Sequence, residues 1–127
     1  MYFVVKEIEF SAAHTLRGHR GPCERLHGHN YRARVALAAA VLDPQGMVLD
    51  FTDFKRILRE ATAPLDHADL SGVPPFDTVN STAENLARHI AAEVARRLPP
   101  GPRVHRVEVW ETSTSCAIYD PDPEEVS

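Results

Sequence analysis

The sequence predicts an α+β fold in which two helices cover one face of a four-stranded antiparallel sheet, in the element order ββααββ. Two stretches near the start and two near the end of the chain alternate apolar and polar residues, which is the period of a half-buried strand. Between them, two stretches repeat apolar residues every three to four positions, which is the period of an amphipathic helix. The length of 127 residues fits one domain, so we expect a single domain over 1–127 that ends in a polar tail at 121–127.

The first two strands are predicted over residues 2–14 and 27–41, with a loop at 15–26 that contains two glycines and a proline. One side of the first strand is apolar and, in the absence of a bulge, extends to its last residue. Its members are Val4, Ile8, Phe10, Ala12 and His14. The apolar side of the second strand comprises His27, His29, Tyr31, Ala33, Val35 and Leu37. Both strands therefore carry histidines on the side that is predicted to be buried.

Two helices are predicted in the middle of the chain. Asp50 is a candidate N-cap for the first helix. The apolar residues that follow it at helical spacing are Phe51, Phe54, Leu58, Ala61 and Leu65. Residues 64–77 are predicted to form a loop. Ser81 and Glu84 match a capping box for the second helix, which the prolines at 99–102 bring to an end. Its apolar stripe is Leu86, Ala87, Ile90, Val94 and Leu98.

The last two strands are predicted over residues 103–111 and near 115–120. The residues His105, Val107, Val109 and Glu111 alternate onto one face of the first of these strands. An unpaired carboxylate on an apolar face is costly, so Glu111 requires a partner. Either an internal arginine or a ligand with two parallel N–H donors would satisfy it.

The charge and composition argue against several classes of function. A net charge of −4 disfavours general binding to nucleic acid, which usually requires a basic surface. No stretch approaches the roughly 20 apolar residues of a membrane span, and the N-terminus lacks the basic region of a signal peptide. We therefore expect a cytoplasmic protein without a membrane partner, in which Cys23 and Cys116 are not joined by a disulfide.

We predict that His14, His27 and His29 converge, because antiparallel pairing through the 15–26 loop places His14 opposite the start of the second strand. Three histidines without a fourth protein ligand are typical of a catalytic zinc site, which keeps one position open. Imidazole also binds other transition metals, so the pattern favours zinc without defining it. The alternative is a hydrogen-bonded core histidine at position 14 and two ordinary strand residues at positions 27 and 29.

Two further groups are candidates for chemistry. Cys23 lies in the loop between the histidine-bearing strands, where a nearby metal ion would favour its thiolate. It is a candidate fourth ligand, base or nucleophile, and an inert buried cysteine is the alternative. In the pair Asp66–His67, the carboxylate can fix the tautomer of the imidazole, although aspartate is also common in turns. The capping box explains Glu84, which is predicted to be structural.

Five motifs occur in order along the chain: FSAAH at 10–14, CERLHGHNY at 23–31, LDHADL at 65–70, NSTAENLA at 80–87 and WETSTSCAIY at 110–119. Together they resemble the motif set of the 6-pyruvoyl-tetrahydropterin synthase and 6-carboxytetrahydropterin synthase family. This resemblance implies a tunnelling fold, in which three chains close a barrel and two trimers stack into a homohexamer. It also implies a pterin substrate, 7,8-dihydroneopterin triphosphate, and one Zn²⁺ ion per subunit.

The resemblance also implies roles for individual residues. The implied metal ligands are His14, His27 and His29. The implied catalytic residues are Cys23 as the base, with Asp66 and His67 completing a triad across a subunit boundary. Glu111 would anchor the pterin by accepting hydrogen bonds from its amino-pyrimidine edge, with Thr82 near the same ring. A proline often stands at the position of Ser81, and a branch of the family with glutamate in place of the cysteine makes a different product.

The expected function is that of a zinc-dependent carbon–oxygen lyase. It would convert 7,8-dihydroneopterin triphosphate to 6-carboxy-5,6,7,8-tetrahydropterin with loss of triphosphate and acetaldehyde, in deazapurine (queuosine-type) biosynthesis. The alternative product is 6-pyruvoyl-tetrahydropterin, and the motifs do not separate the two. A zinc hydrolase that uses metal-bound water, and a pterin- or metal-binding oligomer without turnover, are alternatives of other classes. Arg17, Arg20 and Arg25 are candidates for binding the triphosphate, or else belong to a solvated loop.

Overall fold

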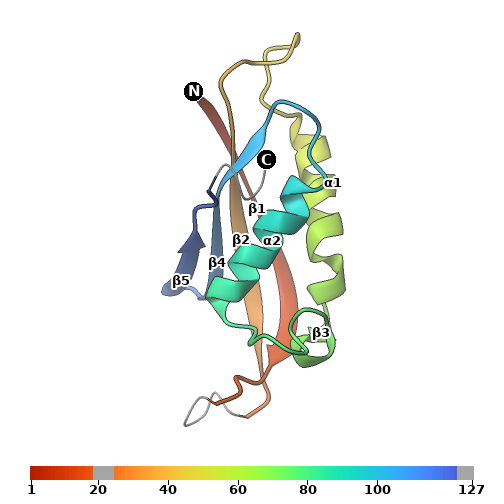
Figure 1. The fold of residues 1–127 in the computed structure, drawn as a ribbon, viewed down its shortest axis with the longest axis vertical. Helices are drawn as coiled ribbons and strands as arrows, with labels where there is room; N and C mark the ends of the chain where they lie inside the picture. Colours follow the sequence, from red (N-terminus) through yellow and green to blue (C-terminus); the bar gives the residue numbers. More distant parts are fainter. Residues whose placement is uncertain (19–24, 123–127) are drawn as a thin grey trace.

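The computed structural model describes residues 1–18 and 25–122, which form an α+β structure with both α-helices on one face of a sheet (Figure 1). In chain order the elements are β1 (Tyr2–His14), β2 (His27–Ala39), α1 (Phe51–Thr62), the 3₁₀ turn η2 (Ala63–Leu65), β3 (Ala68–Asp69), the 3₁₀ turn η3 (Leu70–Gly72), α2 (Ala83–Ala95), β4 (Arg103–Thr112) and β5 (Ser115–Tyr119). The strands lie side by side in the order β3-β1-β2-β4-β5.

The sheet has five strands, so the prediction of a four-stranded, wholly antiparallel sheet is wrong by one strand. The four long strands pair antiparallel as expected. The additional strand, β3, lies in the segment predicted to be a loop and pairs parallel with β1 through Ala68 and Asp69. A strand of two residues is too short to leave an alternating pattern, so sequence periodicity does not reveal it.

The core lies between the inner face of the sheet and the apolar sides of the two helices. Its fully buried members include Tyr31, Val35, Leu37, Phe54, Leu58, Leu86, Ile90 and Val107. The pairing of β1 with β2 runs without a bulge from Tyr2 opposite Ala39 to His14 opposite His27. The alternation predicted for both strands is therefore maintained to the end at which the histidines lie.

The face predicted for His105 is wrong because β4 is irregular. The register between β2 and β4 shifts between Ala36 and Leu37, so that Leu37 pairs with Val104. Val104 is buried in the core, whereas His105 lies on the outer face with its ring 4.8 Å from that of Phe3. A bulge adds one residue to a strand and so moves a side chain to the opposite face of the sheet. Whether a bulge forms depends on how two distant segments pair, so the alternation within one strand does not reveal it.

Both helices begin at capping residues, but only one of these residues is the predicted one. Asp50 caps α1 as expected and accepts a hydrogen bond from the Thr52 amide at 2.7 Å. Phe51 was predicted to face the core, yet it is 55% exposed at the first position of the helix. The cap of α2 is Thr82, whose hydroxyl accepts a hydrogen bond from the Asn85 amide at 3.1 Å. The capping box predicted for Ser81 therefore does not form.

Candidate metal centre and adjoining pocket

Three histidine side chains converge where β1 ends and β2 begins. His14 comes from the end of β1, and His27 and His29 come from the start of β2. One ring nitrogen from each lies within 4.8 Å of the others. The Nε2 atoms of His14 and His27 are 2.8 Å apart. The predicted convergence of these three side chains is confirmed.

The backbone fixes the tautomers of two of these histidines. Nδ1 of His14 lies 2.9 Å from the carbonyl oxygen of Ser81, to which it donates a hydrogen bond. Nδ1 of His27 lies 2.8 Å from the carbonyl oxygen of Arg25 and donates in the same way. With the proton on Nδ1, each Nε2 carries a lone pair that faces the other. Two lone pairs at this distance repel each other unless a cation or a proton lies between them, and a hydrogen-bonded Nδ1 is the usual outer support of a metal-binding histidine.

The third histidine has an unsatisfied nitrogen. Nε2 of His29 is buried and has no hydrogen-bond partner among the described residues. Leaving a buried polar atom without a partner is costly, and coordination of a metal ion would remove this cost. The donor set therefore fits a transition metal ion, because neutral imidazole suits zinc, copper, iron and nickel.

Burial keeps His14 in the form that binds metal. Burial lowers the pKa of His14, and charges on His27 and His29 lower it further, while the hydrogen bond to Ser81 and the charge of Glu111 act in the opposite direction. A neutral imidazole is the form that coordinates a metal. The hydroxyl of Tyr31 is buried 3.2 Å from Nδ1 of His14, and burial together with Glu111 raises its pKa, so it remains protonated.

A hollow of about 470 Å³ adjoins the histidine cluster through Thr82, which follows the His14 partner Ser81, and through Glu111, whose charge acts on His14. Its lining residues are Leu16, Thr82, Ala83, Glu84, Glu111, Ser115, Cys116, Ala117 and Ile118. Glu111 and Thr82, which were expected to bind one ligand, thus line the same hollow. No ion pair joins Glu111 to an arginine within residues 1–18 and 25–122, so the internal partner considered for it is not found there.

Sequence reasoning missed two residues of this region. Glu84 was assigned only a structural role in a capping box, but it lines the hollow from the first turn of α2. Ser81 was expected to serve as a cap, yet it is buried with its hydroxyl 3.2 Å from Nδ1 of His14. The signal that would have revealed the different role of Ser81 is the alternative cap one residue later, since threonine is also a favourable N-cap.

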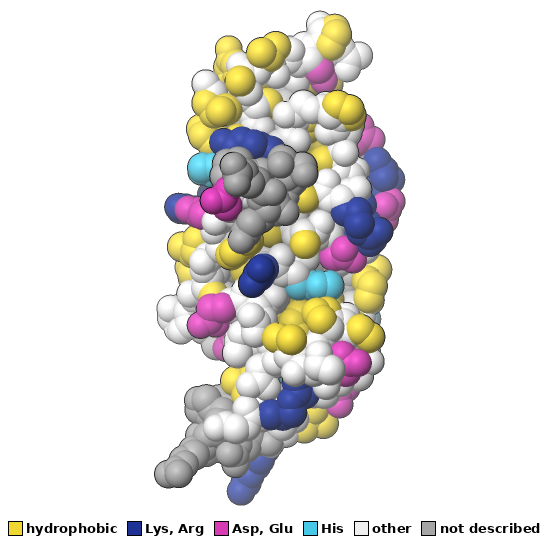
Figure 2. All heavy atoms as spheres, viewed as in Figure 1, with side chains coloured by type: hydrophobic (Ala, Val, Ile, Leu, Met, Phe, Trp, Pro, Cys, Tyr) yellow, Lys and Arg dark blue, Asp and Glu magenta, His cyan; other side chains and the backbone are white. Residues whose placement is uncertain are grey.

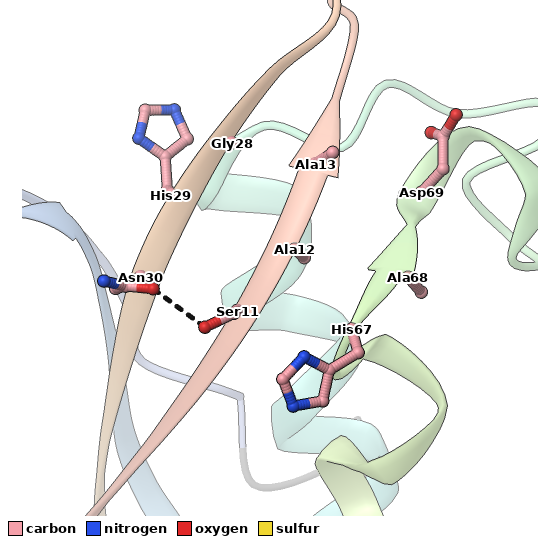
Figure 3. Close-up of a pocket in the computed structure, with 9 residues that line it drawn as sticks. All are labelled: Ser11, Ala12, Ala13, Gly28, His29, Asn30, His67, Ala68 and Asp69. Atoms are coloured by element: carbon pink, nitrogen blue, oxygen red, sulfur yellow. Dashed lines mark hydrogen bonds between the residues drawn. The ribbon is translucent and has the colours of Figure 1, made fainter.

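Asp66 and His67 make hydrogen bonds to the main chain of Ser11. The carboxylate of Asp66 accepts a hydrogen bond from the Ser11 amide at 3.0 Å, and the amide of His67 donates to the Ser11 carbonyl at 2.6 Å. Figure 3 shows the ring of His67 beside Ser11 on the β3 side of β1, whereas His29 extends from β2. The His67 side chain is 83% exposed and borders an open hollow of about 500 Å³, whose lining also includes His29.

Several predicted candidates lie outside the described residues or are engaged elsewhere. Cys23, the expected base, and Arg20 lie outside them. The guanidinium group of Arg17 donates to the carbonyl oxygen of Phe76 at 3.3 and 3.4 Å. Cys116 is a free, exposed thiol.

The surface has no dominant charge on the face seen in Figure 2. Basic and acidic side chains are intermixed there with hydrophobic ones. None of the helices in the described ranges is long and apolar enough to cross a membrane.

The fold and the site together define an α+β protein with a candidate three-histidine metal centre next to a hollow that contains carboxylates. Residues 3–122 match the family described as 6-pyruvoyl tetrahydropterin synthase. The chain belongs to this family, which confirms the resemblance seen in the sequence motifs.

Individual relatives support this assignment over nearly the whole chain. A Synechocystis protein named 6-carboxy-5,6,7,8-tetrahydropterin synthase is 40% identical over 124 residues, which cover 94% of this chain and 93% of the relative. A human protein named 6-pyruvoyl tetrahydrobiopterin synthase is 35% identical over 130 residues, covering 91% of this chain and 89% of the relative. The structure of Caenorhabditis elegans 6-pyruvoyl tetrahydropterin synthase superposes with a TM-score of 0.83 at 29% identity, covering 96% and 98% of the two chains.

Proposed function

We propose that the chain is a zinc-dependent lyase that converts 7,8-dihydroneopterin triphosphate to 6-carboxy-5,6,7,8-tetrahydropterin. The products would include triphosphate and acetaldehyde, and the atom balance requires the uptake of one water molecule. The observation that carries the proposal is the convergence of three imidazoles, one with an unsatisfied Nε2, beside a hollow lined by carboxylates. Membership of the family supplies the class of substrate.

The proposed metal ligands are His14, His27 and His29. Their Nδ1 contacts to the carbonyl groups of Ser81 and Arg25 would orient two of the rings toward the ion. A bound zinc ion would act as a Lewis acid that acidifies the side-chain hydroxyl groups of the substrate. Zinc is favoured because three histidines with an open position are typical of its catalytic sites.

We assign the pterin ring to the hollow next to the histidines. The carboxylate of Glu111 would accept two hydrogen bonds from the amino-pyrimidine edge, and the hydroxyl of Thr82 would lie near the same ring. The thiolate of Cys23 would remove protons next to the ring, with Asp66 and His67 supporting this proton transfer from a neighbouring subunit. The ring would become tetrahydro through internal redox, so no nicotinamide cofactor is required.

A homohexamer built from two trimers, each closing a barrel of the tunnelling fold, is the assembly that we propose. Within the described residues, β5 ends the sheet on one side, and on the other side β3 covers only Ala12 and Ala13 of β1. Open strand edges pair readily with other chains, which supports assembly through these edges. We further propose that residues 1–127 form a single synthase domain that acts in the cytoplasm in queuosine-type biosynthesis, without a nucleic-acid or membrane partner.

Incubation of the zinc-loaded protein with 7,8-dihydroneopterin triphosphate tests the reaction. We expect release of acetaldehyde together with 6-carboxytetrahydropterin, both measured by chromatography. A pyruvoyl product without acetaldehyde would instead support the second candidate, 6-pyruvoyl-tetrahydropterin synthase, which the similarity to the human relative favours. Tight binding of the substrate without any conversion would contradict both lyase assignments and support a binding protein without turnover.

Replacement of Glu111 by glutamine tests the assignment of the hollow. A hydrogen bond to a charged acceptor contributes about 1.5–3 kcal/mol, so we expect kcat/KM to fall about ten- to a hundredfold, mainly through KM. The matched control is Glu108→Gln, because Glu108 precedes Glu111 on β4 and accepts a hydrogen bond from Trp110 Nε1 at 3.1 Å outside this hollow. Equal kcat/KM values for the Glu111 variant and the unsubstituted protein would rule out the anchoring role.

A further inference from the structure

A reciprocal pair of hydrogen bonds joins Asn80 to the main chain of Arg17. The amide of Arg17 donates to Oδ1 of Asn80 at 3.0 Å, and Nδ2 of Asn80 donates to the carbonyl oxygen of Arg17 at 2.9 Å. A carboxamide carries both a donor and an acceptor, so asparagine can satisfy both main-chain groups of one residue. The contact fixes the backbone three residues after His14, where the chain leaves β1.

Asn80 is itself held by the start of α2. Its carbonyl oxygen accepts a hydrogen bond from Nδ2 of Asn85 at 2.9 Å. The main-chain amide of Asn85 in turn bonds to the hydroxyl of Thr82, the N-cap of the helix. The first turn of α2 therefore provides a rigid support for the contact between Asn80 and Arg17.

Residues next to Asn80 and next to Arg17 belong to the candidate site. Ser81 follows Asn80 and accepts the hydrogen bond from His14. Thr82 follows next and lines the hollow that contains Glu111. On the other side of the contact, Leu16 precedes Arg17 and lines the same hollow. The reciprocal hydrogen bonds thus connect the segment that contributes Leu16 to the hollow with the segment that contributes Thr82.

We propose that Asn80 is a positioning residue that holds Leu16 in place as a wall of the ring-binding hollow. The ligand would be a flat, bicyclic pterin, so this inference rests on the proposed function. Because the bonds made by Asn80 reach the main chain of Arg17 rather than any histidine, its removal should weaken binding of the ring and leave metal binding intact.

Two substitutions separate the two halves of the contact. Asn80→Ala removes both hydrogen bonds. Asn80→Asp keeps the acceptor for the Arg17 amide but loses the donor to the Arg17 carbonyl. The matched control is Thr78→Ala, which removes the hydrogen bond from the Thr78 hydroxyl to the Pro75 carbonyl in the same segment without affecting residue 17.

The first measurement is hydrogen exchange at the Arg17 amide, followed by NMR on the zinc-loaded protein. We expect faster exchange in Asn80→Ala, and exchange close to that of the unsubstituted protein in Asn80→Asp and Thr78→Ala. The second measurement is binding of neopterin, whose oxidised ring does not undergo the reaction, followed by its fluorescence. The loss of water-exposed hydrogen bonds should raise the Kd roughly fivefold in Asn80→Ala and by a smaller factor in Asn80→Asp.

Zinc stoichiometry and the melting temperature distinguish positioning from a general structural role. We expect both to stay near the unsubstituted values while the Kd for neopterin rises. Unchanged exchange at Arg17 in Asn80→Ala would overturn the proposal, as would a loss of neopterin binding that merely follows loss of zinc. Failure of the proposed function would be seen in the unsubstituted protein, which would then not bind neopterin. That result would also overturn the role of Asn80 in holding a pterin.

Discussion

Replacement of His29 by alanine is expected to abolish metal binding and turnover while leaving the metal-free protein about as stable as before. Nε2 of His29 is buried without a hydrogen-bond partner among the described residues, so its removal costs no hydrogen bond. The ring packs against those of Tyr31 and His14, with centroids 5.3 and 5.2 Å away, and the loss of this packing should cost no more than about 1 kcal/mol.

The effect on the metal should be large because the site has only three protein ligands among the described residues. Loss of an outer-shell partner typically lowers metal affinity 10- to 100-fold, and we expect loss of a ligand to exceed this range. A bound metal contributes several kcal/mol to stabilisation of the transition state, so turnover should fall by a factor of about a thousand or more.

Chelator competition, metal analysis and thermal unfolding measure these quantities. Zinc should raise the melting temperature of the unsubstituted protein, because a ligand that binds only the folded state stabilises it. This rise should be absent in His29→Ala. The matched control is His105→Ala, since His105 lies on the outer face of the sheet against Phe3. A His29 variant that retains zinc with unchanged affinity would contradict the assignment of the metal centre.

The convergence of the three histidines was predictable from sequence because its geometry is local to two strands. A strand alternates its side chains strictly, so His27 and His29 share a face whenever the strand is regular. Pairing without a bulge then places His14 opposite His27. The same reasoning failed for His105, because a shift in the register of β4 against β2 depends on contacts between distant segments.

The parts of the site that the sequence did not reveal depend on tertiary contacts. Ser81 and Thr82 are both good N-caps, and the buried contact between Ser81 and His14 leaves Thr82 as the cap. Glu84 lines the hollow from the first turn of α2, together with residues of β4 and β5 that are distant in the chain. The role of the Asp66 carboxylate was hidden for a similar reason, since its partner is the amide of Ser11, which is 55 residues away in the chain.

Similar tertiary contacts set the position of His67. The amide of His67 and the carboxylate of Asp66 both bond to the main chain of Ser11, at the edge of β1. His67 adopts a φ of 56°, a left-handed conformation that is uncommon for residues other than glycine. The main-chain bonds hold it there, and its imidazole remains 83% exposed with Nε2 3.7 Å from the Asp66 carboxylate. An exposed imidazole near a carboxylate is accessible to a group from another chain.

We therefore expect Cys23→Ala and His67→Ala each to lose most of their activity and to regain part of it when their subunits are mixed. General acid–base catalysis typically contributes 10²- to 10⁴-fold, so each variant alone should lose kcat by a factor in this range with zinc retained. A hydrolase that uses metal-bound water would instead keep substantial turnover without the thiol. The measurement is kcat and zinc content for each variant and for oligomers reassembled from equal amounts of both.

The activity of the mixed oligomers follows from symmetry. If each site combines the thiol of one subunit with the imidazole of its neighbour, random mixing restores both groups in roughly a quarter of the sites. If both groups come from the same chain, mixing restores none. The matched control mixes the unsubstituted protein with the double variant Cys23→Ala/His67→Ala, for which a shared site retains roughly a quarter of the activity and an unshared site roughly half. The contrary outcome is that mixed oligomers hold zinc but stay inactive while the control mixture retains about half of the activity. That result would place the catalytic groups within one subunit, and His67 would have to turn toward the histidine cluster of its own chain.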